Sequence, residues 1–142
     1  MHSLRLTPLY WAVLGGHEEV VKVLLAREDV DPNNTAMDAR TPLWVAADNG
    51  HEGVVKLLLE RGDINIEASD AYGRSPLWVA ACQGREEIVK RLLARDVDSD
   101  GAKCDSAILL SVVAHNGHEG VVRLLLERHS RRVTNTADSH PG

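Results

Sequence analysis

Residues 70–93 read DAYGRSPLWVAACQGREEIVKRLL, and this pattern returns along the chain at a nearly constant interval. The segment TPL begins at residues 7 and 41 and SPL begins at residue 75, so the offset is 34 each time. Gly-His-Glu or Gly-Arg-Glu begins at residues 16, 50, 84 and 117, with offsets of 34, 34 and 33. Four units at this period predict a repeat architecture, in which each unit buries its apolar face against its neighbours.

Each unit predicts two short helices separated by a glycine turn. Thr or Ser before Pro is typical of a helix start, because the hydroxyl caps the helix and Pro fits its first turn. Glycine then tolerates the positive φ with which many helices end. The first helices are expected at about 8–15, 42–49, 76–83 and 109–116, and the second at about 18–27, 52–61, 86–95 and 119–128.

The composition limits both the interior and the class of protein. The chain of 142 residues has no Phe, so small side chains such as Ala12, Ala46, Ala80 and Ala114 are expected to let neighbouring helices approach closely. An apolar content of 44% argues against disorder, and a net charge of −5 argues against a general nucleic-acid surface. No apolar run reaches the roughly 18 residues of a membrane span. Residues 4–14, a short apolar stretch with a weak positive flank, resemble a signal peptide, but the repeat explains them better.

Enzyme and metal chemistry find little support in the sequence. Two cysteines, Cys82 and Cys104, cannot form a disulfide framework. They could form one bridge, but we expect a reduced, intracellular protein of the cytoplasm or nucleus. The spacing His115-x-x-His118 near Cys104 hints at a metal, but His118 falls at the repeated Gly-His turn and therefore has a structural explanation. No nucleophile with a partner base and no phosphate-binding glycine loop is present. We predict no catalytic residues, no metal and no cofactor.

The best-preserved unit carries a family resemblance. Residues 70–81 (DAYGRSPLWVAA), Gly84 and residues 88–93 (IVKRLL) closely resemble the ankyrin repeat, and the resemblance extends over about 5–130. It implies an all-α ankyrin-repeat solenoid of about four helix-turn-helix units joined by short β-hairpin-like loops. Residues 41–60 (TPLWVAADNGHEGVVKLLLE) are also similar to the arrays of large fungal multidomain receptors and regulators.

Departures from the family pattern set the expected domain boundaries. The expected units are 1–33, whose N-terminal hairpin is missing or partial, 34–67, 68–100 and a degenerate fourth unit at 101–130, followed by a flexible tail at 131–142. The glycine of the hairpin tip is kept only as Gly73, with Ala39 and Ser106 in its place elsewhere. Neither end has the polar face of a capping repeat, so we expect a segment of a longer array or a natural truncation with poorly protected ends. An oligomerisation surface formed by the uncapped ends is an alternative to partner binding.

The resemblance implies a non-catalytic protein–protein interaction module or scaffold, with a protein or peptide partner on a concave face of hairpin tips and first helices. Nucleic acid and membrane are not expected partners. A purely structural spacer within a larger regulatory protein is the alternative, and a metal- or thiol-dependent enzyme is a remote one. The predicted partner-binding positions differ between units: Met37, Asp38, Arg40, Asp48, Asn49, Ala71, Tyr72, Arg74, Cys82, Gln83, Cys104, Asp105, Ala107, His115 and Asn116.

Aromatic side chains recur at the repeat spacing as Tyr10, Trp44 and Trp78. Such a row could supply anchors for a partner. Packing between adjacent units explains the row better, because the position is usually part-buried in the family. Tyr72 and Arg74, at a hairpin tip, are the preferred anchor candidates.

Overall fold

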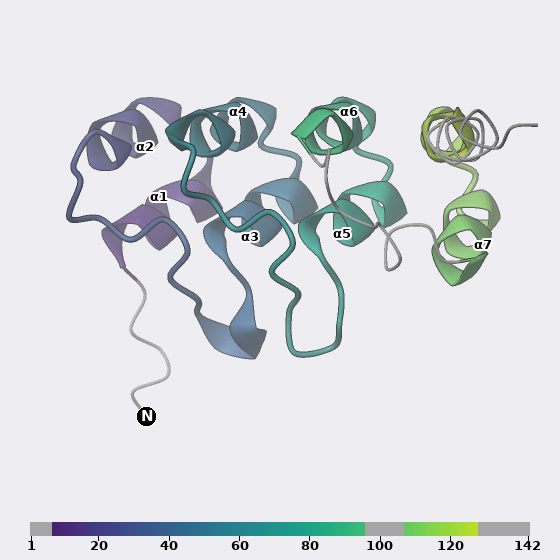
Figure 1. Cartoon of the computed structure of the whole chain (residues 1–142), viewed down its shortest axis with the longest axis horizontal. Helices are drawn as coiled ribbons and strands as arrows, with labels where there is room; N and C mark the ends of the chain where they lie inside the picture. The colour runs from purple at the N-terminus through teal and green to yellow at the C-terminus, as the bar shows by residue number, and fades with distance from the viewer. Residues whose placement is uncertain (1–6, 96–106, 128–142) are drawn as a thin grey trace, which may run out of the picture.

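The computed structural model describes residues 7–95 and 107–127, which form a stack of antiparallel helix pairs (Figure 1). Two short helices cannot bury an apolar face alone, so each pair packs against the next one along the chain. The pairs are α1 (Pro8–Gly15) with α2 (Glu18–Leu25), α3 (Pro42–Asn49) with α4 (Glu52–Arg61), α5 (Pro76–Cys82) with α6 (Glu86–Arg95), and α7 (Ala107–His115) with helical residues 119–127.

The first helices start as the Thr-Pro and Ser-Pro pairs predict. The hydroxyl oxygens of Thr7, Thr41 and Ser75 each accept a hydrogen bond of 3.1 Å from the main-chain N–H three residues later. Proline follows at the first helical position, where its missing N–H leaves no bond unmade. The caps of α3 and α5 therefore place the two described tips, at 36–40 and 70–74, directly before a first helix.

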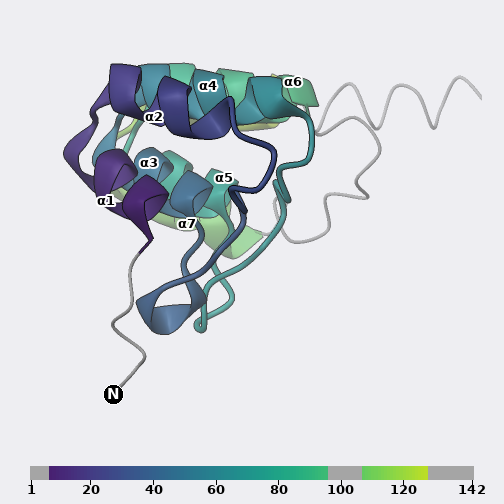
Figure 2. The same cartoon turned by 90° about the vertical axis from the view of Figure 1, so that its left-hand side faces the viewer.

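The helices lie in two layers (Figure 1). One layer holds α1, α3, α5 and α7, and the other holds α2, α4 and α6. Within the first layer α3 packs on α1 and α5, and within the second α4 packs on α2 and α6. Figure 2 shows that the connections after α2 and α4 extend beyond the first layer, on the side away from the second. The short 3₁₀ helix η2 (Met37–Ala39) forms one of these tips.

Alanine, valine and leucine fill the interior between the layers, as the absence of Phe predicts. Ala12, Ala46 and Ala80 are buried, but the prediction for Ala114 is wrong because that residue is exposed. One residue fewer separates the third and fourth units, so Val113 occupies the equivalent place and is fully buried. Small and branched side chains fill the space because the helices of adjacent units lie close together.

Helix boundaries agree with the predictions to within two residues. The largest differences are at α2, which stops at Leu25, and at α7, which starts at Ala107. The proposed unit boundaries stay predictions, and the proposed N-terminal partial hairpin and the tail at 131–142 lie outside the described residues. None of the helices within 7–95 and 107–127 is long and apolar enough to cross a membrane.

Candidate functional site

The tip before α5 is organised around one buried carboxylate. Asp70 is only 5% exposed, and its Oδ1 accepts hydrogen bonds from the N–H groups of Tyr72 (3.0 Å) and Arg74 (2.9 Å). Its Oδ2 accepts from Nε (3.0 Å) and Nη2 (2.9 Å) of Arg74. Burial opposes ionisation, but the hydrogen bonds from Arg74 and Tyr72 outweigh it and hold the pKa of Asp70 below its ordinary value. The carboxylate therefore fixes the backbone of this tip.

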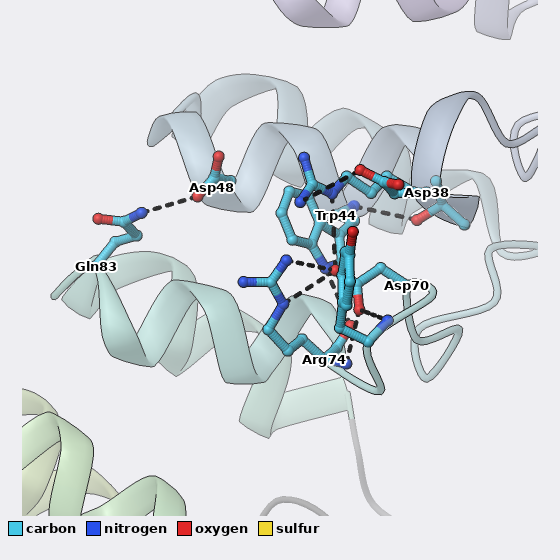
Figure 3. A network of polar contacts seen from close by, with 9 residues as sticks. Asp38, Trp44, Asp48, Asp70, Arg74 and Gln83 are labelled. Carbon is cyan, nitrogen blue, oxygen red and sulfur yellow. Dashed lines mark hydrogen bonds and ion pairs between the residues drawn. The ribbon is translucent and has the colours of Figure 1, made fainter.

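Two arginines flank Trp44 beside this carboxylate (Figure 3). The guanidinium carbon of Arg40 lies 4.2 Å from the centre of the Trp44 ring, and that of Arg74 lies 5.5 Å from it. Arg40 Nε is 3.7 Å from Asp70 Oδ2, so the carboxylate attracts both cations. The indole N–H of Trp44 donates to the carbonyl of Arg74 at 3.0 Å. The side chains of the second unit thus support the tip of the third.

The two successive tips are joined through their main chains. The N–H of Ala71 donates to the carbonyl of Asp38 at 2.7 Å. At the earlier tip Asp38 and Ala39 both have a φ of 61°. Asp tolerates this left-handed region, but it is strained for Ala, and glycine stands at the equivalent position of the next tip. The tip of the second unit therefore has two residues in the left-handed region, whereas the tip of the third unit has only Gly73 there.

Tyr72 is the outermost side chain of this network. It is 68% exposed, and the guanidinium of Arg74 lies 5.2 Å from the centre of its ring. Asp70 and Arg74 hold the backbone beneath the ring, so the phenol is presented from an ordered loop. An aromatic ring held in this way loses little conformational freedom on contact with a partner, which is the property of an interface anchor.

A second cluster lies at the far ends of the first helices. Gln83 Nε2 donates to Asp48 Oδ1 at 2.9 Å (Figure 3), and Asn116 Nδ2 donates to the carbonyl of Cys82 at 3.2 Å. These contacts link successive units, as the contacts at the tips do. The two clusters are separated by about 12 Å, the length of an eight-residue helix such as α3.

The predicted partner-binding residues therefore fall into two groups rather than one continuous stripe. Asp38, Arg40, Tyr72 and Arg74 meet at the tips, whereas Asp48, Cys82, Gln83 and Asn116 meet at the helix ends. Ala71 and Asn49 are exposed beside these groups, and His115 is exposed at the end of α7. Met37 lies in η2 and Ala107 starts α7, while Cys104 and Asp105 lie outside the described residues.

Asp70 organises the tip, yet the comparison of units does not reveal it. The equivalent residues of the second and fourth units are Ala36 and Lys103, so no repeated acidic position draws attention to it. The signal that was available is the D-x-x-G-x-S/T-P pattern itself, in which the acidic residue precedes a positive-φ glycine.

The aromatic row packs between units. Tyr10 and Trp44 are buried and Trp78 is partly buried, so little of the first two rings is accessible to a partner. Burial raises the pKa of Tyr10, with Arg40 opposing and Asp38 reinforcing that effect. The preferred interpretation of the row as packing residues agrees with this burial.

Cys82 and His118, which were considered for thiol or metal chemistry, make contacts that stabilise the fold. Burial raises the pKa of the Cys82 thiol to about 11, against a weak opposing effect of Arg74. His118 Nε2 lies 3.1 Å from the carbonyl of Cys82, which accounts for this ring at the Gly-His turn. No group of three or more His, Cys, Asp or Glu side chains suited to a metal occurs among residues 7–95 and 107–127.

An open pocket of about 170 Å³ lies where the turn after α3 meets the start of α6. Its charged lining residues are Glu52, Arg85, Glu86 and Glu87. Arg85 Nη2 donates to the carbonyl of Asp48 at 3.0 Å, so the one cation of the lining joins the second unit to the third. The pocket lies at the turns and takes in none of the predicted partner-binding residues.

Comparison with known proteins agrees with this architecture. A family model described as ankyrin repeats in three copies matches residues 9–105. The human ASB11 ankyrin repeat domain has a similar crystal structure, with a TM-score of 0.73 and 27% sequence identity over 87% of this chain. The match covers 54% of that protein's chain, so the present sequence spans about half its length. No curated protein matches the sequence. Ankyrin repeats generally act as protein–protein interaction modules, and with three of them matched over most of its length, this chain belongs to the ankyrin repeat family.

Proposed function

We propose that the chain is a non-catalytic binding module that takes a protein or peptide partner on the surface formed by its tips and first helices. In family terms this surface is the concave face. The supporting observation is the exposed Tyr72 ring, held on a loop whose backbone is fixed by the Asp70–Arg74 pair. Ordered aromatic side chains of this kind supply much of the binding free energy at protein interfaces.

The charges around Tyr72 support a peptide or protein partner over a polyanion. Arg40 and Arg74 lie beside Asp38 and Asp70, so positive and negative groups alternate within a short distance. The carboxylates already neutralise these two guanidinium groups in part. A phosphate backbone would need uncompensated cations, whereas a protein surface can match both signs.

The chemistry of Cys82 supports the non-catalytic part of the proposal. A thiol with a pKa of about 11 is protonated at neutral pH and is a poor nucleophile. A location inside the cell, in the cytoplasm or nucleus, belongs to the same proposal and is supported by the free thiol of Cys82.

A capture experiment with matched variants tests the binding surface. Partners captured from cell extract by the wild-type chain are identified by mass spectrometry, and each is then titrated against purified variants. Tyr72→Ala is expected to weaken binding by about 10-fold or more, whereas Tyr72→Phe keeps the ring and most of the affinity. Lys56→Ala is the control, because Lys56 is exposed on the second helix α4, outside the tips and the first helices.

Equal binding of the wild type and Tyr72→Ala would show that the assigned surface is wrong. Failure of the wild type to bind any purified candidate would favour the spacer alternative. Arg74→Ala is a poor probe of contact, because it removes the hydrogen bonds that hold the tip and so mixes folding with binding.

A further inference from the structure

The interface between successive units repeats the same buried apolar positions. On the second helices, Val54, Ile88 and Val121 are at most 2% exposed. On the first helices, Val45 and Val79 are also buried. These positions recur at the repeat spacing, and the helices that carry them pack on the preceding unit. They form the side of each unit that faces toward the N-terminus of the chain.

The first unit carries the same apolar chemistry on a side that no described residue covers. Val20 stands at the position of Val54 and is 51% exposed, and Trp11 stands at the position of Val45 and is 61% exposed. Val23 lies on the same helix and is exposed as well. A tryptophan and two valines accessible to water on one face are the pattern of an interaction surface rather than of scattered apolar residues.

A polar contact accompanies every internal interface in the same register. His51 Nε2 lies 3.2 Å from the carbonyl of Leu14. Arg85 and His118 occupy the same place in the next two units, and they reach the carbonyls of Asp48 and Cys82 at 3.0 and 3.1 Å. His17 is the equivalent residue of the first unit and lies exposed at the uncovered face. The acceptors Leu14, Asp48 and Cys82 occupy the same position of successive units, and His115 occupies that position in the fourth unit. In a preceding unit, the acceptor for His17 would therefore be the carbonyl of the residue equivalent to His115.

The opposite end of the stack presents the complementary surface. The turn glycines Gly16, Gly50 and Gly84 each have a side chain of the following unit within 3 Å of the place a Cβ would occupy. Gly117 has the same left-handed backbone, with φ +78°, and no described atom lies within 4 Å of that place. Leu126 is 46% exposed, whereas Leu59 at the equivalent position is 5% exposed and its carbonyl accepts a hydrogen bond from Arg95 of the next unit. The fourth unit therefore shows the surface that a following unit covers elsewhere.

We propose that a second copy of this chain stacks head to tail on the first, in the register of the internal interfaces. The N-terminal face of one copy, formed by Trp11, Val20 and Val23, would cover the C-terminal face of the other, formed by the Gly117 turn and Leu126. Both halves of the interface are present on one chain, which points to another copy as the occupant. The contact is heterologous and does not close on itself, so association continues beyond a dimer as concentration rises. It does not involve the tip surface proposed above.

Sedimentation velocity of the full chain over a wide concentration range tests this assembly. The wild type is expected to gain mass steadily with concentration. Val20→Arg should raise the dissociation constant by roughly 10-fold or more, the factor for losing one fully buried valine side chain. Glu60→Arg is the control, because Glu60 is exposed on α4, which lies between α2 and α6 and away from both end faces. Val20 and Glu60 are both exposed, so circular dichroism should show an unchanged fold for either variant.

Mixing two variants distinguishes the head-to-tail arrangement from contact between like faces. Val20→Arg blocks the N-terminal face, and Leu126→Glu blocks the C-terminal face. Each variant alone should associate roughly 10-fold or more weakly than the wild type, whereas an equimolar mixture should form a dimer with the wild-type affinity that grows no further. A wild type that is monomeric at all concentrations, or a Leu126→Glu variant that dimerises alone as tightly as the wild type, overturns the proposal. So does a mixture that stays monomeric.

Discussion

The guanidinium of Arg74 donates two hydrogen bonds to a single carboxylate oxygen of Asp70, at 3.0 and 2.9 Å, and this pair closes the tip loop before α5. The other carboxylate oxygen binds two main-chain N–H groups of the same loop. Asp70 is therefore both the partner of a cation and the organiser of a backbone turn. Its charge state should influence the stability of the whole stack, because neighbouring tips are joined by the bond from Ala71 to Asp38.

Stability should fall in acid as Asp70 takes up a proton. The pKa of Asp70 is lowered in the folded chain, so its contribution is complete above the unfolded-state value of about 3.9 and is lost as pH falls through the lower folded-state value. Asp70→Asn should therefore lower the free energy of unfolding by about 1–3 kcal/mol at neutral pH. Urea titrations of both proteins from about pH 7 down to about pH 3, which is below the ordinary Asp pKa, check this expectation. A difference between wild type and variant that does not shrink below pH ~4 would contradict it.

Ala39→Gly should stabilise the chain. Ala39 has a φ of 61°, and relief of about 1–2 kcal/mol of left-handed strain exceeds the added flexibility of glycine, which costs about 0.5–1 kcal/mol. The net gain should be about 0.5–1 kcal/mol in the free energy of urea unfolding. The reciprocal variant Gly73→Ala is the control, since Gly73 has a φ of 82° and open space around it. It should lose a similar amount, and equal stability of all three proteins would refute the strain argument.

Gly84→Ala should be more damaging than Gly117→Ala, although the two turns have nearly the same backbone. Their φ values are 74° and 78°, so both variants suffer the same strain. At Gly84 a Cβ would also come within 2.5 Å of the His118 ring, whereas no described atom lies within 4 Å at Gly117. The steric overlap should cost a further ~1–3 kcal/mol.

Chemical denaturation followed by circular dichroism measures this difference. The double variant Gly84→Ala/His118→Ala separates the two contributions, because removal of the ring should recover the steric part of the loss. Equal effects of the two single alanine variants would mean that the ring moves aside freely.

Cys82 should react slowly with thiol reagents at neutral pH. Its pKa of about 11 lies well above that of an ordinary cysteine, near 8.5, so its thiolate fraction is lower by roughly 100-fold or more. Iodoacetamide labelling of a Cys104→Ser variant, compared with glutathione, isolates the rate of Cys82. The rate should rise steeply as pH approaches 11, and a rate equal to that of glutathione at neutral pH would show that burial does not suppress ionisation.

Sequence patterns predicted the local features of this fold well. Thr7, Thr41 and Ser75 cap helices because capping depends on a few adjacent residues, and the 34-residue period sets the stacking of the units. The tip network was less accessible, because Asp70, Arg40 and Trp44 come from different units and meet only when the tips approach each other. The exposure of Trp11 could have been anticipated, since it occupies the place of buried Val45 and no described unit precedes it.

The glycine turns also give the stack a direction. At each turn from Gly16 to Gly84, the atoms nearest to the place of a Cβ belong to a side chain of the unit that follows, and no described atom lies within 4 Å of that place at Gly117. Detachment of the last helix pair would remove His118 and expose the Gly84 turn of the third unit to water. Detachment of the first pair would leave the side chains that cover the later turns in place. Fraying should therefore spread from the C-terminal unit toward the N-terminal one, and amide hydrogen exchange should be fastest at the C-terminal turn and slow progressively toward α1.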